Sequence, residues 1–294
     1  MKDHQEDFYP VAMTIAGSDS GGGAGIQADL RTFNAAGVFG CSVITAITAQ
    51  NPREITHVAA MTPETVEAQF RTVISALAVK AVKTGMLANA SIVKTVAGLL
   101  KKHRFPLVVD PVMISTSGTR LLDEDGLQAM KNELLPLANM ITPNIPEAEW
   151  LTGSKLRNQA DYIQAAMHLA QNYKCNVLLK TGHSADKGSK ICDIAIIDQT
   201  SYLLASPRVG DLSEYASHGT GCTLSSGITA MLAAGCSWKD ALRAAKAHVY
   251  GALNETAHIG KDLDGMYPPL EDHSKFITLA KLTAAKDSGK GPRA

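Results

Sequence analysis

The segment "SHGTGCTLSSGI", residues 217–228, holds the side chains best suited to chemistry. Its thiol, Cys222, follows two glycines and begins an apolar, helix-like run. A glycine turn that opens a helix leaves backbone N–H groups unpaired, and these groups bind anions together with the helix dipole. The same field lowers the pKa of a thiol placed there. We therefore expect an anion site at residues 219–222, with a low-pKa Cys222 beside it.

Two chemistries fit an anion site beside a thiol. In acyl transfer Cys222 would be the nucleophile and His218 its base. That pair has poor geometry across a glycine turn, and no third orienting group is evident. Phosphoryl transfer needs the charge of the migrating group to be held and an acceptor hydroxyl to be oriented near a proton acceptor. The glycine turn can hold the charge of the migrating group, and Cys222 can be the proton acceptor. The pattern therefore favours phosphoryl transfer.

A second glycine-rich segment, "AGSDSGGGAGIQADL", spans residues 16–30. It matches a relaxed dinucleotide fingerprint at Gly23, Gly25 and Ala28, but residues 30–53 lack the acidic residue that would bind the ribose. A nicotinamide-dependent oxidoreductase is therefore disfavoured, and the missing GxxxxGK[ST] pattern excludes a Walker-type loop. Two interpretations stay open: a flexible turn, or a backbone that closely approaches a small ligand because glycines carry no side chains.

Short apolar runs alternate with amphipathic stretches, and these elements must position the two glycine loops. The expected strands lie at 11–17, 42–50, 81–85, 106–111, 139–144, 176–182 and 193–198. The expected helices include 63–77, 91–103 and 159–173. Strand, helix, strand at this spacing predicts an α/β fold, in which helices cover both faces of a mostly parallel sheet.

Polar residues gather where the expected strands end. In open α/β sheets, ligands bind beyond the carboxyl ends of the strands. The residues at these ends are Gly17 to Asp19, Gln50 with Asn51, Asp110, Asn144, and Lys180 with Thr181. The pattern favours one site built from several loops.

Composition limits the classes of function. Among 294 residues, 28 Lys and Arg balance 28 Asp and Glu, which argues against a nucleic-acid or anionic-membrane partner. The five cysteines form no CxxC pair, so neither a disulfide framework nor a zinc cluster is indicated. The sequence starts with charged residues and has no apolar run long enough to span a bilayer. We expect a cytoplasmic protein in which residues 1–282 form a single domain and 283–294 a polar, disordered tail.

These segments together resemble a known family. "TIAGSDSGGGAGIQADL", "GCSVITAITAQN", "KTGML", "VVDPVM", "TPNIPEAEWLTG", "LLKTGH" and "HGTGCTLSSGI" occur in the order and spacing of hydroxymethylpyrimidine/phosphomethylpyrimidine kinases. The resemblance covers roughly residues 11–255. It implies a ribokinase-like three-layer α/β sandwich. It also implies ATP-dependent phosphorylation of 4-amino-5-hydroxymethyl-2-methylpyrimidine, and then of its monophosphate to the diphosphate, in thiamin biosynthesis.

The resemblance also implies roles for individual residues. The anion hole would be Gly219, Thr220, Gly221 and Cys222, with Cys222 where many ribokinase relatives carry an aspartate base. The pyrimidine would be bound by Gly17, Asp29, Gln50, Met86 and Val112. The ATP phosphates would be bound by Asn144, Glu147, Lys180, Thr181 and Gly182. Asp110 and Glu147 would bind Mg²⁺, which commonly uses one or two carboxylates with phosphates and water.

The chain departs from the family pattern in places. Where the family shows a glycine-rich "GxGxGP" segment, this chain has "HIGKDLDGMYPPL", and "KTGH" replaces "KGGH". Relatives of this fold phosphorylate pyridoxal, and one group of them has a second cysteine after the "DPVM" segment. Ser115 stands at that place here, which favours the pyrimidine kinase over a pyridoxal/pyridoxine kinase or a dual-specificity enzyme.

Two further expectations concern assembly and activity. The family resemblance implies a homodimer. A catalytically silent ligand sensor is the alternative from another class of function, but it need not retain the nucleotide-side residues Asn144, Glu147, Lys180 and Cys222.

Overall fold

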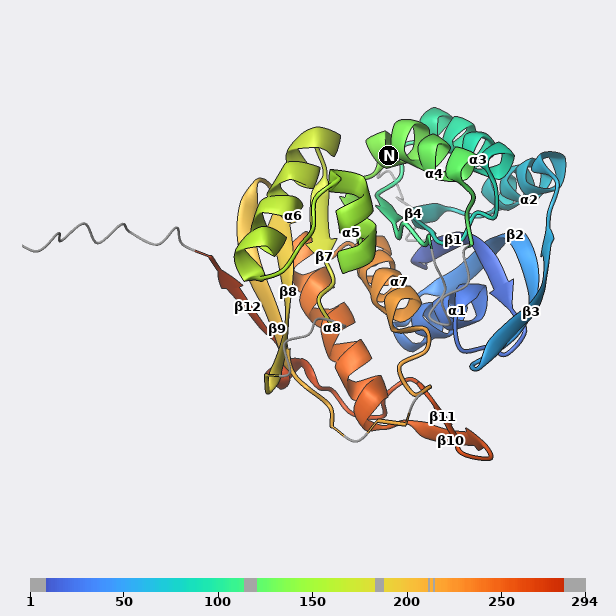
Figure 1. Cartoon of the computed structure of the whole chain (residues 1–294). Coiled ribbons are helices and arrows are strands. Elements are labelled where there is room, and N and C mark those ends of the chain that lie inside the picture. The colour runs from blue at the N-terminus through green and yellow to red at the C-terminus, as the bar shows by residue number, and fades with distance from the viewer. Residues whose placement is uncertain (1–8, 114–120, 183–187, 211, 214, 283–294) are drawn as a thin grey trace, which may run out of the picture.

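The computed structural model describes residues 9–113, 121–182, 188–210, 212–213 and 215–282. The strands of its main sheet are β1 (Val11–Asp19), β2 (Phe39–Asn51), β3 (Glu54–Ala60), β4 (Val79–Thr84), β5 (Leu107–Val109), β6 (Met140–Ile141), β7 (Asn176–Leu179), β8 (Lys190–Ile197), β9 (Thr200–Pro207) and β12 (Thr278–Lys281). Within these described ranges they form one ten-stranded sheet in the order β12-β9-β8-β7-β6-β5-β4-β1-β2-β3 (Figure 1).

The sheet is parallel in its centre and antiparallel at both sides. β1 pairs in parallel with β2 and β4, and the parallel pairing continues through β5, β6 and β7. β3, β8, β9 and β12 pair antiparallel with their neighbours. The central strands β5, β6 and β7 are buried at every position, as strands covered by helices on both faces must be. The predicted α/β class and the mostly parallel sheet are therefore confirmed.

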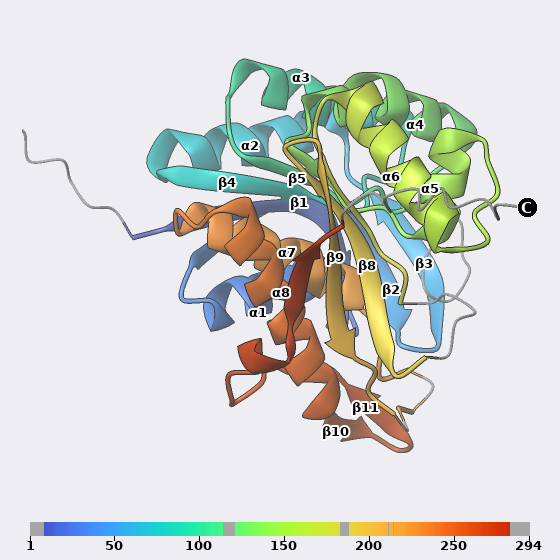
Figure 2. The same ribbon diagram turned by 90° about the vertical axis from the view of Figure 1, so that its left-hand side faces the viewer.

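Helices cover both faces of the sheet (Figure 2). One layer holds α2 (Pro63–Ala76), α3 (Ala90–Lys102), α4 (Glu124–Ala129), α5 (Ile145–Thr152) and α6 (Gln159–Tyr173). The other holds α1 (Gly25–Ala35), α7 (Thr220–Ala233) and α8 (Trp238–Asn254). Each layer has its own hydrophobic core against the sheet, so the molecule is a three-layer sandwich.

Local sequence signals explain where several helices begin. Thr62 precedes α2 and accepts a hydrogen bond from the Thr65 backbone N–H, with Pro63 in the first turn. Asn89 and Asn158 cap α3 and α6 in the same way. All three helices begin within one residue of their predicted positions.

The order of the strands creates a crevice. From β1 the chain passes to β2 on one side, and it later returns to place β4 on the other side of β1. Connections that diverge in opposite directions leave an open space beyond the carboxyl ends of the strands. The loop after β1, which carries the first glycine segment, lies at this point.

Several strands were missed or misjudged in length. The edge strands β3 and β12 contain no buried residue, and β9 has an apolar run of only four residues, Tyr202 to Ala205, so none of them stands out in the sequence. Residues 106–111 and 139–144 contribute strands of only three and two residues, because the polar ends of both runs turn into the loops of the site. The divergent segment after α8 forms a hairpin of β10 (Ala257–Gly260) and β11 (Leu263–Gly265). The predicted tail, 283–294, lies outside the described residues, and the single domain over 1–282 stays a prediction.

Candidate active site

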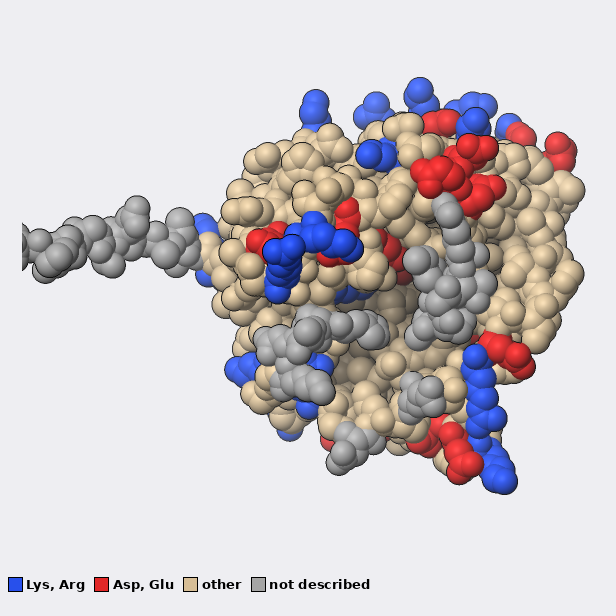
Figure 3. All heavy atoms as spheres, in the orientation of Figure 1, with Lys and Arg blue, Asp and Glu red and all other residues tan. Residues whose placement is uncertain are grey.

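A cavity of about 390 Å³ opens at the carboxyl ends of the parallel strands, and the space-filling view shows the hollow (Figure 3). It is lined by residues from all five of the strand ends that the sequence singled out. These residues are Gly17, Ser18 and Asp19 at the end of β1, Gln50 on β2, Asp110 after β5, Asn144 after β6 and Lys180 after β7. The structure thus brings the predicted loops together around one space.

The two glycine-rich segments contact each other at the edge of this cavity. Gly219 has φ +86°, a left-handed conformation that glycine adopts readily, and a Cβ there would collide with the Gly23 carbonyl oxygen. A Cβ on Gly23 would lie 2.5 Å from His218 Cδ2. Residues about 200 positions apart therefore pack backbone against backbone, which explains why both segments are rich in glycine.

The first turn of α7 faces the cavity. Gly219 is its N-cap residue and has no side chain to accept from the free N–H groups of the turn. A Cβ on Gly221 would lie 3.3 Å from Lys180 Nζ and 3.6 Å from Asp110 Oδ2. The backbone N–H groups of α7 and a lysine ammonium therefore meet at one place, and both favour a bound anion.

Cys222 lines the cavity beside this turn. The prediction that its thiol has a lowered pKa is wrong. Burial raises the pKa of Cys222 to about 11, although the Lys83 ammonium and a hydrogen bond with the Gly25 backbone N–H act in the opposite direction. Desolvation of the thiolate thus outweighs the stabilisation that Lys83 and the Gly25 N–H provide. His218 contacts Asp19 and Gln50, so the two groups are not arranged as a nucleophile and its base.

A buried ion pair lies at the end of the cavity where the sequence predicts the ATP phosphates. Lys180 Nζ donates to Asp110 Oδ1 at 2.7 Å, and Thr142 Oγ1 donates to the same oxygen at 3.0 Å. Burial alone would raise the pKa of Asp110, but the ammonium groups of Lys180 and Lys83 hold it below its ordinary value. Asp110 is therefore ionised.

Asn144 and Glu147 form the N-terminal capping box of α5. Asn144 Oδ1 accepts from the Glu147 backbone N–H at 2.9 Å, and Glu147 Oε2 accepts from the Asn144 backbone N–H at 2.8 Å. Burial raises the pKa of Glu147 to about 7 despite the nearby Lys180, and the Asp110 carboxylate adds to this rise. Both residues of the box line the cavity.

Asp29 lies elsewhere than expected. Its carboxylate is fully buried under the cavity, accepts from Lys83 Nζ with both oxygens at 2.8 Å, and receives the hydroxyls of Thr14 and Ser226 at 2.6 Å. Asp29 is not among the described residues that line the cavity, whereas Lys83 is. Its acceptor positions are used by these buried partners, so direct contact with a pyrimidine is not what this carboxylate does.

Thr181 is also turned away from the cavity. Its backbone N–H donates to Asp193 Oδ1 at 2.7 Å, and Lys246 Nζ donates to Asp193 Oδ2 at 2.6 Å. Thr181 is buried and is not among the described lining residues, whereas Gly182, Asp193 and Lys246 are. Its contribution is to fix the turn that carries Lys180 and Gly182.

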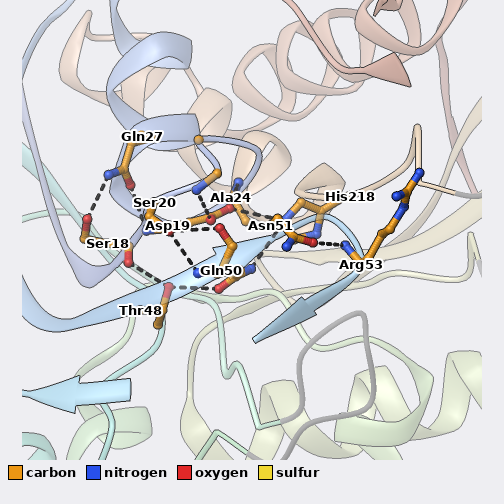
Figure 4. A network of polar contacts seen from close by, with 12 residues as sticks. Ser18, Asp19, Ser20, Ala24, Gln27, Thr48, Gln50, Asn51, Arg53 and His218 are labelled. Carbon is orange, nitrogen blue, oxygen red and sulfur yellow. Dashed lines mark hydrogen bonds and ion pairs between the residues drawn. The ribbon is translucent and has the colours of Figure 1, made fainter. Parts of the chain in front are cut away.

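The proposed pyrimidine end is formed by β1, β2 and the loops after β4 and β5. Gly17, Gln50, Met86 and Val112 all line it. A Cβ on Gly17 would lie 3.1 Å from Met86 Sδ, so the glycine leaves room beside that sulfur. Figure 4 shows Gln50 within a polar network that also contains Ser18, Asp19, Thr48 and His218.

Sequence reasoning assigned no individual role to several residues that line the site. Lys83 stands in the quoted "KTGML" segment and Asp19 at a marked strand end, so both were within reach of the motif argument. Asp193 and Lys246 carry no local signal, because their pairing joins β8 to α8. Ser115 and the histidine of "KTGH" lie outside the described residues.

The described residues show neither a metal-binding cluster nor a membrane-spanning helix. They contain no group of three or more His, Cys, Asp or Glu side chains placed to hold a metal ion. No helix in the described part of the chain is both long and apolar enough to cross a membrane.

Comparison with known proteins identifies the family. A family model described as phosphomethylpyrimidine kinase matches residues 19–267. A hydroxymethylpyrimidine/phosphomethylpyrimidine kinase of Haemophilus influenzae is 43% identical over 252 residues, which cover 85% of this chain and 93% of the relative.

Solved structures agree with this assignment. A phosphomethylpyrimidine kinase from Clostridium difficile superimposes with a TM-score of 0.72 at 40% identity, covering 83% of this chain and 99% of that chain. A pyridoxal kinase from Staphylococcus aureus, in complex with AMP-PCP, superimposes with a TM-score of 0.82 at 31% identity, covering 94% of this chain and all of the other. From its motifs, its sheet and these likenesses, the chain belongs to the phosphomethylpyrimidine kinase family.

Proposed function

We propose that this protein transfers the γ-phosphoryl group of ATP to the hydroxymethyl group of 4-amino-5-hydroxymethyl-2-methylpyrimidine, and then to the monophosphate to give the diphosphate. The observation that carries the proposal is the meeting of the α7 backbone N–H groups with Lys180 at a point between two halves of one cavity. In the first transfer the hydroxymethyl oxygen forms a bond to phosphorus, the bond from phosphorus to the ADP oxygen breaks, and Cys222 accepts the hydroxyl proton. In the second transfer an oxygen of the monophosphate, which is largely ionised at neutral pH, forms the bond to phosphorus and ADP again leaves.

The pyrimidine would lie among Gly17, Gln50, Met86 and Val112. The Gln50 amide can both donate to and accept from the edge of an aminopyrimidine, and the Met86 and Val112 side chains supply apolar contacts for the ring. This half of the cavity adjoins the glycine turn at Gly219, so a hydroxymethyl group can reach the anion site.

The nucleotide would occupy the other half. Apolar side chains from the segment after β9 and from α8 continue the cavity and suit an adenine base; they are Val209, Leu212, Val249 and Leu253. Lys180, Asn144 and Gly182 then lie on the phosphate side. AMP-PCP in the related pyridoxal kinase supports the use of ATP.

The acidic pair Asp110 and Glu147 fits Mg²⁺. Burial raises the pKa of Glu147 to about 7 and the Asp110 carboxylate adds to the rise, so a cation bound between them would favour the ionised form of both. Two carboxylates are what Mg²⁺ commonly uses when phosphates and water complete its coordination. When bound there with ATP, the ion would neutralise phosphate charge, while Lys180 holds the phosphates and the α7 amides receive the transferred group.

Cys222 would accept the proton of the substrate hydroxyl. Because burial keeps its pKa near 11, most molecules carry the neutral thiol at neutral pH, and only the thiolate fraction can accept. Positioning and the electrostatics of the anion site therefore supply most of the acceleration, as is general for phosphoryl transfer.

The direct test is turnover of purified protein with ATP, Mg²⁺ and hydroxymethylpyrimidine, followed by mass spectrometry. The expected products are ADP and first the monophosphate, then the diphosphate. A preparation that binds ATP but forms neither product from the pyrimidine or its monophosphate would contradict the proposal.

Pyridoxal is a second candidate substrate, because pyridoxal kinases are among the similar structures. A parallel assay with pyridoxal separates the two: we expect the pyrimidine to have the higher kcat/KM. A higher value for pyridoxal would reverse the assignment of substrate.

Assembly and location complete the proposal. We expect a homodimer, as the family resemblance implies, and a cytoplasmic location, as the composition of the sequence suggests. The outer strands β2 and β3 expose apolar Ile47 and Val58, which suits contact with a second copy. Light scattering coupled to size exclusion tests the dimer, and fractionation of cells tests the location.

A further inference from the structure

His218 joins three segments that lie far apart in the sequence. Its Nε2 is 3.2 Å from Asp19 Oδ2 at the end of β1 and 3.4 Å from Gln50 Nε2 on β2 (Figure 4). His218 directly precedes the glycine turn that begins α7. The side chain is 9% exposed, so these contacts are largely shielded from water.

Asp19 fixes the state of this histidine. Its Oδ1 accepts from the Gly21 backbone N–H at 2.8 Å, and its Oδ2 accepts from the Ala24 backbone N–H at 2.8 Å. Burial alone would raise the pKa of Asp19, but the contact with His218 and the two backbone N–H groups lower it. The ionised carboxylate can only accept, so the ring nitrogen that faces it must carry a proton. The buried Nδ1 of His218 has no partner among the described residues.

In this orientation the Gln50 amide cannot form hydrogen bonds with both of its neighbours. Its Oε1 lies 3.0 Å from Thr48 Oγ1, and its Nε2 faces His218 Nε2. A ring nitrogen that donates to Asp19 cannot also accept from Gln50. In addition, Thr48 Oγ1 lies 2.9 Å from the Ser18 carbonyl oxygen, and its single proton cannot serve both Ser18 and Gln50.

Rotating the amide by half a turn resolves both conflicts. The Gln50 nitrogen then donates to Thr48 Oγ1, the Thr48 hydroxyl donates to Ser18, and the Gln50 oxygen accepts from the His218 N–H. The two ends of an amide have almost the same shape, so the surrounding donors and acceptors decide between the orientations. The protonated Nε2 of His218 therefore selects the rotated form.

We propose that His218, anchored by Asp19, is a positioning residue that fixes the orientation of the Gln50 amide and thereby the order of donor and acceptor offered to the pyrimidine edge. This inference rests on the proposed function, in which Gln50 binds that edge. An aminopyrimidine edge places a hydrogen-bond donor beside an acceptor. If the Gln50 amide is rotated the wrong way, its N–H faces the donor and its oxygen faces the acceptor, so neither hydrogen bond forms. The histidine thus acts on recognition of the pyrimidine, through Gln50, and leaves the nucleotide half of the cavity untouched.

The test compares His218→Gln with His218→Met, two side chains of similar length that differ in the terminal donor. We expect His218→Met to raise the KM for hydroxymethylpyrimidine about tenfold, as expected for a lost buried hydrogen bond, with a smaller change in kcat. His218→Gln, whose amide can donate to Asp19, should stay within about threefold of the wild-type KM. His168→Met, an exposed histidine on α6, is the matched control.

Asp19→Asn provides a second, isosteric variant should His218→Met not fold. It is expected to raise the KM for hydroxymethylpyrimidine about fivefold or more. The double variant Asp19→Asn/His218→Met should have a KM no higher than that of the more impaired single variant, because both substitutions act on one contact. Calorimetry should show weaker pyrimidine binding in His218→Met with unchanged affinity for AMP-PCP.

Each result has a distinct meaning. If the wild-type enzyme phosphorylates the pyrimidine and either His218→Met or Asp19→Asn keeps the wild-type KM, the positioning role is overturned but the proposed function is not. Equal losses in His218→Gln and His218→Met, or additive effects of the Asp19 and His218 changes, also overturn it. Wild-type protein that neither binds nor phosphorylates the pyrimidine overturns the proposed function together with this inference.

Discussion

Asp29 holds the ammonium group of Lys83 with both carboxylate oxygens at 2.8 Å, and both side chains are fully buried beneath the cavity. Thr14 and Ser226 complete the shell around the carboxylate. With these two hydroxyls the ion pair links β1, β4, α1 and α7 beneath the cavity. We therefore expect the ion pair to contribute to the stability of the fold.

Lys83→Met should destabilise the fold by about 3–5 kcal/mol, because it leaves the Asp29 charge buried without its counter-ion. Thermal unfolding measures the loss. Lys80→Met, an exposed lysine on the same strand, should change stability little and is the control. The double variant Lys83→Met/Asp29→Leu removes both charges and should recover much of the loss; a double variant less stable than Lys83→Met would argue against an uncompensated charge as the cause.

Gly221→Ala should lower kcat about tenfold or more with little change in thermal stability. Its Cβ would reach within 3.3 Å of Lys180 Nζ, where the phosphoryl group is expected, and a displaced anion-site donor typically costs at least this much. Gly98→Ala on α3 has nothing within 4 Å of the added Cβ and should stabilise the protein by about 0.5–1 kcal/mol. Wild-type turnover in Gly221→Ala would place the phosphoryl group elsewhere.

Cys222→Ala should reduce the single-turnover rate about 10²-fold, in line with loss of a general base. Since the pKa of the thiol is raised to about 11, the thiolate fraction grows tenfold for each pH unit below that value, and the wild-type rate should rise between pH 6 and 9. In Cys222→Asp the same burial would raise the carboxyl pKa above its ordinary value of about 3.9 but keep it below that of the thiol, so the rise in rate should move to lower pH. A pH-independent wild-type rate, or a near-normal rate in Cys222→Ala, would show that the thiol is not the general base. Catalysis would then depend on the backbone N–H groups of residues 219–222.

Asp193→Asn should raise the KM for ATP about tenfold and leave the KM for the pyrimidine unchanged. The substitution weakens the contacts with Thr181 and Lys246 that fix the turn bearing Lys180 and Gly182, and hydrogen bonds to charged groups account for an effect of this size. Asp198→Asn, exposed and in a left-handed conformation that asparagine tolerates, is the control. Equal effects on both KM values would indicate general loosening of the fold instead.

The fold was largely predictable because its signals are local. Apolar runs mark buried parallel strands such as β7, and caps such as Asn158 mark where helices begin. The strand ends therefore pointed to the correct edge of the sheet, and the motifs "HGTGC" and "TPNIPEAEW" pointed to the family. Edge strands such as β3 escaped prediction, since half-exposed residues carry no continuous apolar pattern.

The sequence by itself determined the α/β class, the two glycine loops and the residues that follow the parallel strands, because each depends on neighbours along the chain. Only the tertiary structure decided that Asp29 pairs with Lys83, that Thr181 faces Asp193, and that His218 lies between Asp19 and Gln50. It also reversed the expected shift of the Cys222 pKa. Burial and pairing are set by residues distant in sequence, and desolvation depends on everything packed around a group, so no local motif encodes them.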